Sequence, residues 1–206
     1  MHGTIFGLAS RVWIDGRARM ARTLIGGVAA GVVLYLIGFV FWGTPLSQLA
    51  FNRLEQPQSA AIQQALAETL TASGTGTYSI PATGTAVGDI AFARGPVAVV
   101  HFNTGGFPVV DSGSLGSGFI LAIITGLIIA AAMGVVGSRI ADFAGRAQVA
   151  VLFALAATLY LDIGQPIFNH FGFGYWIYLF VSDFVGLAAA GLIIARWFLP
   201  RGGILS

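Results

Sequence analysis

Three side chains that could do chemistry, Asp162, His170 and Asp183, lie close together in an aromatic-rich stretch spanning residues 160–184. They stand out because only 9% of the chain is charged. An acid in an apolar helix can hold a proton or a cation, and a histidine can hold a metal or a pigment. Either can also cap a helix end or simply be solvated. The choice depends on whether water or lipid surrounds each residue.

The surrounding elements are predicted to be membrane spans. Hydrophobic residues make up 56% of the chain, and a span needs about 20 mainly apolar residues. Four windows qualify: 23–42, 118–138, 147–163 and 173–195. The predicted fold class is a mainly α membrane protein with four transmembrane helices and a small α/β lobe, residues 43–117, between the first two.

Asp183 falls near the middle of the fourth window, where an unpaired carboxylate is costly, so it is expected to face protein rather than lipid. Counted along the helical rise, one hydroxyl from each other span lies at about the same depth of 17–20 Å. These hydroxyls belong to Tyr35, Thr125 and Thr158. We predict a buried polar layer around Asp183. It either fixes the register of a helix bundle, which is the preferred interpretation, or binds a proton or cation.

Asp162 and His170 are expected at or beyond the water boundary, solvated, capping helix ends or paired with each other. Aromatic residues gather where the fourth window begins, and Tyr and Trp favour such interfaces. Tyr175, Trp176 and Tyr178 are the predicted interface aromatics.

Small residues spaced four apart predict close helix packing. Gly27 and Gly31 form one such pair, and Gly126, Ala130, Gly134 and Ser138 form a longer series. Gly186 and Ala190 follow Asp183 on its helix face. These motifs name no partner.

Arginine placement predicts the orientation. Eight of the ten arginines flank the membrane on the side that four crossings make common to both termini: Arg11, Arg17, Arg19, Arg22, Arg139, Arg146, Arg196 and Arg201. The positive-inside tendency makes that side the cytoplasm. Residues 43–117 are then periplasmic, and the location is a bacterial inner membrane. Residues 1–22 are predicted to form a cytoplasmic interfacial helix, with a disordered tail as the alternative, and 196–206 a cytoplasmic tail.

The outward lobe shows weaker patterns. Residues 56–71 favour a helix, 72–89 read as loop, and 95–103 favour a strand that carries His101. One helix and two or three strands enclose little core, so the lobe is expected to lean on the bilayer, a second copy or another subunit. His101 is interpreted as structural or exposed rather than as a ligand.

The motifs of known catalytic chemistry are missing from the sequence. It contains no GxSxG, HExxH, P-loop or dinucleotide fingerprint, and no cysteine. A site built from His101, His170, Asp111 and Asp162 is conceivable, but their spacing does not favour it. We therefore expect no enzyme activity, no catalytic residue, no metal site and no cofactor.

Three stretches, GPVAVVHFNTGG, IGGVAAGVVLYLIGFVFWGTPLSQLAF and GQPIFNHFGFGYWIYLFVSDFVGLAAAGLIIARWF, carry a resemblance. They resemble an uncharacterised family of small bacterial inner-membrane proteins with an N-terminal anchor, an outward α/β lobe and three further spans. The resemblance implies this topology and no activity.

The expected function is that of a non-catalytic subunit of a larger inner-membrane assembly, with respiratory and photosynthetic complexes as candidate hosts. Expected partners are the lipid bilayer and other membrane subunits or further copies of the chain, with no nucleic acid. The alternative is a small transporter or ion-conducting oligomer that uses Asp183. A sensor or binding module would need a ligand pocket in residues 43–117.

Overall fold

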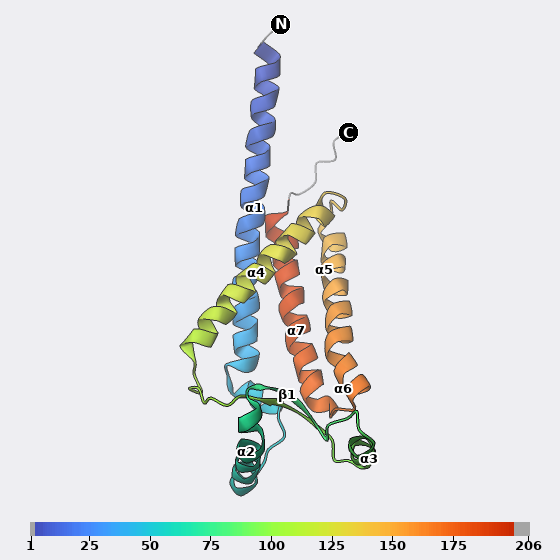
Figure 1. Cartoon of the computed structure of the whole chain (residues 1–206). Helices are drawn as coiled ribbons and strands as arrows, with labels where there is room; N and C mark the ends of the chain where they lie inside the picture. Colours follow the sequence, from blue (N-terminus) through green and yellow to red (C-terminus); the bar gives the residue numbers. More distant parts are fainter. Residues whose placement is uncertain (1–2, 200–206) are drawn as a thin grey trace. The chain divides into compact units, whose positions relative to one another are not determined.

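The computed structural model describes the backbone of residues 3–199 and the side chains of residues 16–18 and 20–199. The chain divides into two compact units. One holds the chain up to Asn52 and from Ser112 onward, and the other is Arg53–Asp111 (Figure 1).

Four helices in the described chain are long and apolar enough to cross a membrane. The first lies within α1 (Gly3–Trp42), and the second is α4 (Ser112–Gly137). The third comprises α5 (Phe143–Thr158), a π-helical turn (Leu159–Ile163) and α6 (Gly164–Asn169). The fourth comprises α7 (Phe173–Ile193) and a π-helical turn (Ile194–Phe198). The mainly α fold class with four spans is confirmed.

The helices extend past the predicted windows where polar residues make good helix ends. Helix α4 begins at Ser112 rather than 118, in a Gly/Ser-rich turn that a hydropathy window leaves out. Helix α5 begins at Phe143 rather than 147 because Asp142 caps it, with its Oδ2 accepting from the Gly145 N–H at 2.7 Å. At its other end, the third candidate span continues to Asn169, well beyond the expected 163.

Helix α1 continues without a break from Gly3 into the first span, so the arm at residues 3–22 is helical. Its predicted place on the membrane surface stays a prediction. The side chains of Arg11 and Arg19, and all of residues 200–206 with Arg201, lie outside the described part of the chain.

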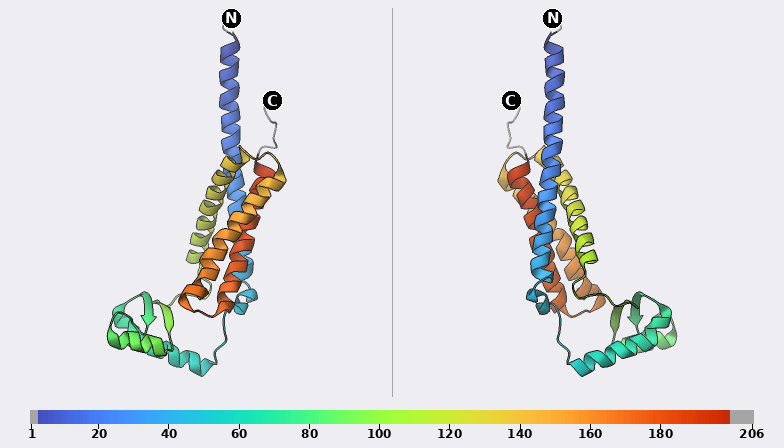
Figure 2. Two further views of the ribbon diagram at one scale, coloured as in Figure 1. Left: turned by 90° about the vertical axis from the view of Figure 1, so that its right-hand side faces the viewer. Right: turned by 90° about the vertical axis from the view of Figure 1, so that its left-hand side faces the viewer.

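The four spans pack in a row rather than as a closed bundle. Helix α1 packs on α4 and α7, and α7 also packs on α5, whereas α4 and α5 barely touch. Figure 1 shows α4 tilted away from α5 along most of its length, and Figure 2 shows the same helices from the two sides. Each end of the row therefore leaves a broad helix face open.

Small residues form the core of this unit. Ala30, Ala130 and Ala190 have no exposed surface, and Ile194 is 1% exposed. Alanine at these positions lets neighbouring backbones approach closely, which is how helices associate where lipid removes the hydrophobic drive. The core is thus built from close backbone contact more than from large side chains.

The unit Arg53–Asp111 contains helix α2 (Gln56–Leu70), strand β1 (Gly76–Ile80), helix α3 (Ala86–Arg94) and strand β2 (Ala98–Phe102). The strands form one antiparallel pair, with Thr77 opposite His101. A short 3-10 turn, Thr71–Ser73, follows α2. Another, Pro45–Leu49, follows α1 in the membrane unit.

The predicted helix at 56–71 and the strand within 95–103 are confirmed. The loop prediction for 72–89 was wrong, because this stretch holds β1 and the start of α3. Alternating Thr77, Tyr78, Ser79 and Ile80 suit a strand that pairs with β2, and Thr85 caps α3 through the Gly88 N–H at 3.1 Å. The many glycines and threonines concealed both signals.

Candidate functional site

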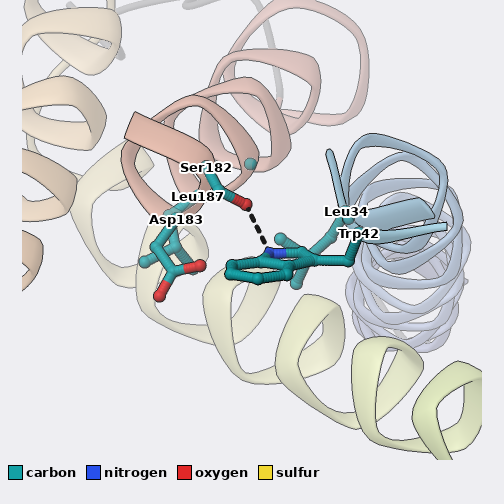
Figure 3. Close-up of a pocket in the computed structure, with 7 residues that line it drawn as sticks. Leu34, Trp42, Ser182, Asp183 and Leu187 are labelled. Carbon is teal, nitrogen blue, oxygen red and sulfur yellow. Dashed lines mark hydrogen bonds between the residues drawn. The ribbon is translucent and has the colours of Figure 1, made fainter. Parts of the chain in front are cut away.

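Asp183 lies on the side of α7 that faces α1 and lines a pocket of about 240 Å³. Figure 3 shows its carboxyl beside Trp42 and Leu34, which come from α1. The lining residues are Leu34, Gly38, Trp42, Ser182, Asp183, Gly186 and Leu187. The acid thus faces protein side chains and a cavity, as the cost of exposing it to lipid requires.

Two glycines shape this pocket in different ways. A methyl group added at Gly186 would lie 2.9 Å from Leu34 Cδ1, so the missing side chain lets α7 approach α1. A methyl group added at Gly38 would meet nothing within 4 Å, so that glycine leaves open space. Gly186 thus brings the two helices together, and Gly38 leaves the empty volume that forms the cavity beside Asp183.

Hydrogen bonds tie α1 to α7 around the pocket. The indole N–H of Trp42 donates to Ser182 Oγ at 3.0 Å, and the hydroxyl of Tyr178 donates to the Phe41 carbonyl at 2.6 Å (Figure 3 draws the first). The Phe41 carbonyl lies in the last turn of α1, where carbonyls lack partners within the helix. Both bonds are polar contacts between helices, and they fix the α1–α7 register next to Asp183.

Asp162 is buried within the protein on the neighbouring span, which corrects the expectation that its side chain is solvated. Its place relative to the water boundary stays a prediction. It is 6% exposed, and its Oδ2 is buried with no hydrogen-bond partner in the described chain. It lies in the π-helical turn, which packs against α7.

The structure does not join the predicted hydroxyls to Asp183. Thr125 donates to the Leu121 carbonyl and Thr158 to the Ala154 carbonyl, each at 2.9 Å and each within its own helix. The Tyr35 ring packs edge-on against Phe119, with centroids 5.2 Å apart. Equal depth in the membrane therefore did not predict that these hydroxyls face Asp183. A threonine hydroxyl in a helix can instead donate to a backbone carbonyl one turn back.

Three of the predicted packing glycines meet where α1 crosses α4. A methyl group on Gly126 would strike the Gly27 carbonyl oxygen and the Gly31 backbone. One on Gly31 would lie 2.6 Å from Ile123 Cα. Ala190 is fully buried, whereas a methyl group at Gly134 would touch nothing within 4 Å.

The predicted interface aromatics form one cluster at the start of α7. Tyr175 lies 5.3 Å from Trp176 and 5.5 Å from Phe51, centroid to centroid, and Trp176 stacks on Phe171 at 5.8 Å. Tyr178 contacts Trp42 edge-on at 5.2 Å. The cluster joins the ends of α1 and α7. Its position relative to a bilayer stays a prediction.

The two histidines among the candidate residues are both exposed. His170 is exposed and follows the last residue of α6, with its backbone in the left-handed conformation at φ of 55°. His101 is exposed on β2, where its Nδ1 hydrogen-bonds the Thr77 hydroxyl at 2.9 Å. This cross-strand pair agrees with the structural interpretation of His101.

Two residues with clear roles were missed from the sequence. Arg146 was interpreted only as a topology signal, yet it is 3% exposed. Its Nε and Nη2 donate to the carbonyls of Ile140 and Gly137 at 2.6 and 3.1 Å, where α4 ends. Asp162 was the other, and the four-residue spacing of buried positions on its helix could have indicated its burial. The buried residues Arg146, Ala150, Ala154, Thr158 and Asp162 recur every four positions.

The chemistry open to this site is that of two acids in an apolar setting. Within the described residues, no group of three or more His, Cys, Asp or Glu side chains could hold a metal ion. Inside the spans, the Ser182 hydroxyl accepts from Trp42, and the Thr125 and Thr158 hydroxyls donate within their own helices. A carboxyl in such a setting can, however, hold a proton.

Comparison with known proteins gives no relative: no family model, no curated protein and no solved structure matches the chain. The four-span architecture therefore stands on the chain itself, and the resemblance to an inner-membrane family stays a prediction.

Proposed function

We propose that the chain is a non-catalytic subunit of a larger assembly in a bacterial inner membrane, where it gives structural or assembly support. The observation that carries the proposal is the lack of a core in the unit Arg53–Asp111. None of its residues is buried. A unit this small is marginal even with a core, so a surface outside the unit must complete it.

The exposed side chains of this unit support a protein partner. Val87 is 80% exposed, Phe107 71% and Val110 76%, although none lies in a membrane span. Leaving large apolar side chains in water forgoes about 1.5–3 kcal/mol each. Covering them by another protein recovers that free energy.

The membrane unit offers complementary surfaces. Because α4 and α5 barely touch, the row of spans leaves its end helices free to pack against neighbours. An apolar groove of about 350 Å³ also runs along α1, lined by Val33, Leu36, Ile37, Val40, Phe41 and Val185. A helix of a neighbouring membrane protein fits such a groove, as does an acyl chain.

Arginine distribution supports an orientation with both termini cytoplasmic and residues 43–117 periplasmic. In that orientation the coreless unit meets partners outside the cytoplasm. Respiratory and photosynthetic complexes are candidate hosts.

Gentle detergent extraction of the tagged full chain tests the proposal, by identifying the proteins that co-purify. A variant carrying Phe107→Ser and Val110→Ser should lose the co-purifying protein while its spans keep their thermal stability. Gln63→Ser, an exposed change in the same unit, is the matched control and should retain it. Extraction of the wild-type chain alone would overturn the proposal, and a complex made only of further copies would replace it with self-association.

A second candidate, a small transporter or ion-conducting oligomer that uses Asp183, is favoured by the cavity beside that residue. Asp183→Asn separates the two. Retained assembly with loss of a proton or cation flux in proteoliposomes supports transport. Equal behaviour of Asn and Asp supports the structural role.

A further inference from the structure

The carboxyl of Asp183 lies in an apolar setting, and the protein supplies no cation beside it. The chain has no lysine. Along the fourth span, Arg196 is about 20 Å further on, and along α1 Arg22 is about 30 Å from Trp42. In the described part of the chain Asp183 forms no ion pair with Arg or His. An acid in this situation by default marks the place of a ligand or an ion.

The cavity that Asp183 lines is larger than a bare ion needs. Its volume of about 240 Å³ equals that of about eight water molecules, at about 30 Å³ each. Leu34 and Leu187 give it apolar walls, and Figure 3 shows both leucines around the carboxyl. The cavity therefore has room for an organic molecule of about ten non-hydrogen atoms.

The indole of Trp42 forms a fixed aromatic wall of the same cavity. Its N–H donates to Ser182 Oγ at 3.0 Å, and its ring contacts Tyr178 edge-on, with centroids 5.2 Å apart. Tyr175 adds a tilted contact at 6.1 Å. Aromatic rings attract cations, tryptophan most strongly, and the attraction grows where water is excluded. A carboxyl and a fixed indole in one apolar cavity are together suited to an ammonium ion with apolar substituents.

We propose that the cavity between α1 and α7 binds an organic cation. The cation is an ammonium whose charge lies against the Asp183 carboxylate and whose apolar substituents fill the space beside Trp42 and Leu34. Binding is noncovalent, so no bond forms or breaks. The site does not depend on the assembly proposed above. It gives the second candidate function a ligand class, and binding and transport can fail separately.

An organic cation suits the cavity better than a metal ion does. Mg²⁺ and Ca²⁺ take about six or more oxygen ligands. The side chains that line the cavity offer one carboxyl and one hydroxyl, Ser182 Oγ, which already accepts from Trp42. An ammonium with apolar substituents needs fewer polar contacts, because burying the substituents away from water is itself favourable.

Equilibrium dialysis of the full wild-type chain in detergent micelles tests the site with benzyltrimethylammonium, whose charge cannot be lost by deprotonation. About one cation per chain should bind above the background of empty micelles. Neopentylbenzene, which has carbon in place of the nitrogen and no charge, should not displace it, and neither should sodium. Absence of binding above background overturns the proposal. Displacement by neopentylbenzene would show a cavity that does not recognise charge, and displacement by sodium would replace the organic cation with a metal ion.

Two variants locate the bound cation. Asp183→Asn keeps the shape of the side chain but not its charge, and should weaken binding by about tenfold or more. Gly38→Leu keeps the carboxylate but fills open volume, since a methyl group there meets nothing within 4 Å, and should abolish binding. Glu68→Gln, which removes an exposed carboxyl of α2, is the control and should bind as the wild type does. Unchanged binding in either cavity variant would place the cation elsewhere and contradict the proposal.

The displacement experiments use the wild-type chain alone, so they test the site even where a variant does not fold. Flux of benzyltrimethylammonium in proteoliposomes then separates this site from the second candidate function. Binding without flux supports the ligand site and removes transport. Flux that survives in Gly38→Leu would contradict the site while transport through another route remains.

Discussion

At the scale of single residues, the α1–α7 contact depends on a few polar atoms in an apolar setting. The Trp42–Ser182 and Tyr178–Phe41 hydrogen bonds lie beside the cavity that Asp183 lines. Lipid offers no competing donor or acceptor, so each such bond fixes a helix position that apolar contacts alone leave free.

The first prediction concerns the Trp42–Ser182 hydrogen bond. Trp42→Phe removes the indole donor, and we expect a loss of about 1 kcal/mol in the free energy of unfolding in detergent. Ser182→Ala should cost a similar amount. The double variant should be no less stable than the worse single variant, since both remove the same bond. Fully additive losses would show that the two side chains act separately.

At the scale of elements, glycine at the α1–α4 crossing replaces side-chain packing by backbone contact. Gly27, Gly31 and Gly126 were predicted from their spacing, and the structure brings them together. Gly134 belongs to the same series, but a methyl group added there would meet nothing within 4 Å. Because α4 tilts away from α1, a four-residue repeat stays in contact over only part of its length.

The second prediction uses this contrast. Gly126→Ala should lower the melting temperature in detergent by several degrees, because the methyl group strikes the backbone of α1 at Gly27 and Gly31. Gly134→Ala, the matched control on the same helix, should be neutral or slightly stabilising. Equal effects of the two substitutions would contradict a close crossing of α1 and α4 at Gly126.

The third prediction concerns the turn between α4 and α5. Arg146 binds the Gly137 and Ile140 carbonyls with two nitrogens of its planar guanidinium. Arg146→Lys keeps the charge but not this geometry, and we expect it to cost about 2 kcal/mol of unfolding free energy. Arg139→Lys, at an exposed position nearby, is the control and should cost almost nothing. If Arg146→Lys left the free energy of unfolding unchanged, the charge and not the guanidinium geometry would stabilise this turn.

At the scale of the whole molecule, the four spans could be predicted because hydropathy needs only composition and length. The order of the helices within the row could not be predicted, because residues at equal depth in the membrane need not face one another. Tyr35, Thr125 and Thr158 show this limit, as each finds its partner on its own helix or on Phe119. Hydropathy did not predict the burial of Asp162 either, because it does not show that the turn carrying this residue packs against α7.

The orientation of the chain is still open to direct measurement. The sequence has no cysteine, so a single introduced cysteine can be labelled without background. The positions Ala72, Ser138 and Asn169 are all exposed and lie in three different connections between or next to the spans. Four crossings put the first and last on one side and the middle one on the other.

The fourth prediction tests these four crossings, on which the assembly role depends. In cells whose outer membrane is permeable, a membrane-impermeant maleimide should label Ala72→Cys and Asn169→Cys. It should reach Ser138→Cys only after the inner membrane is disrupted. Labelling of Ser138→Cys together with Ala72→Cys in intact cells would contradict a second crossing between them, and with it the proposed assembly role.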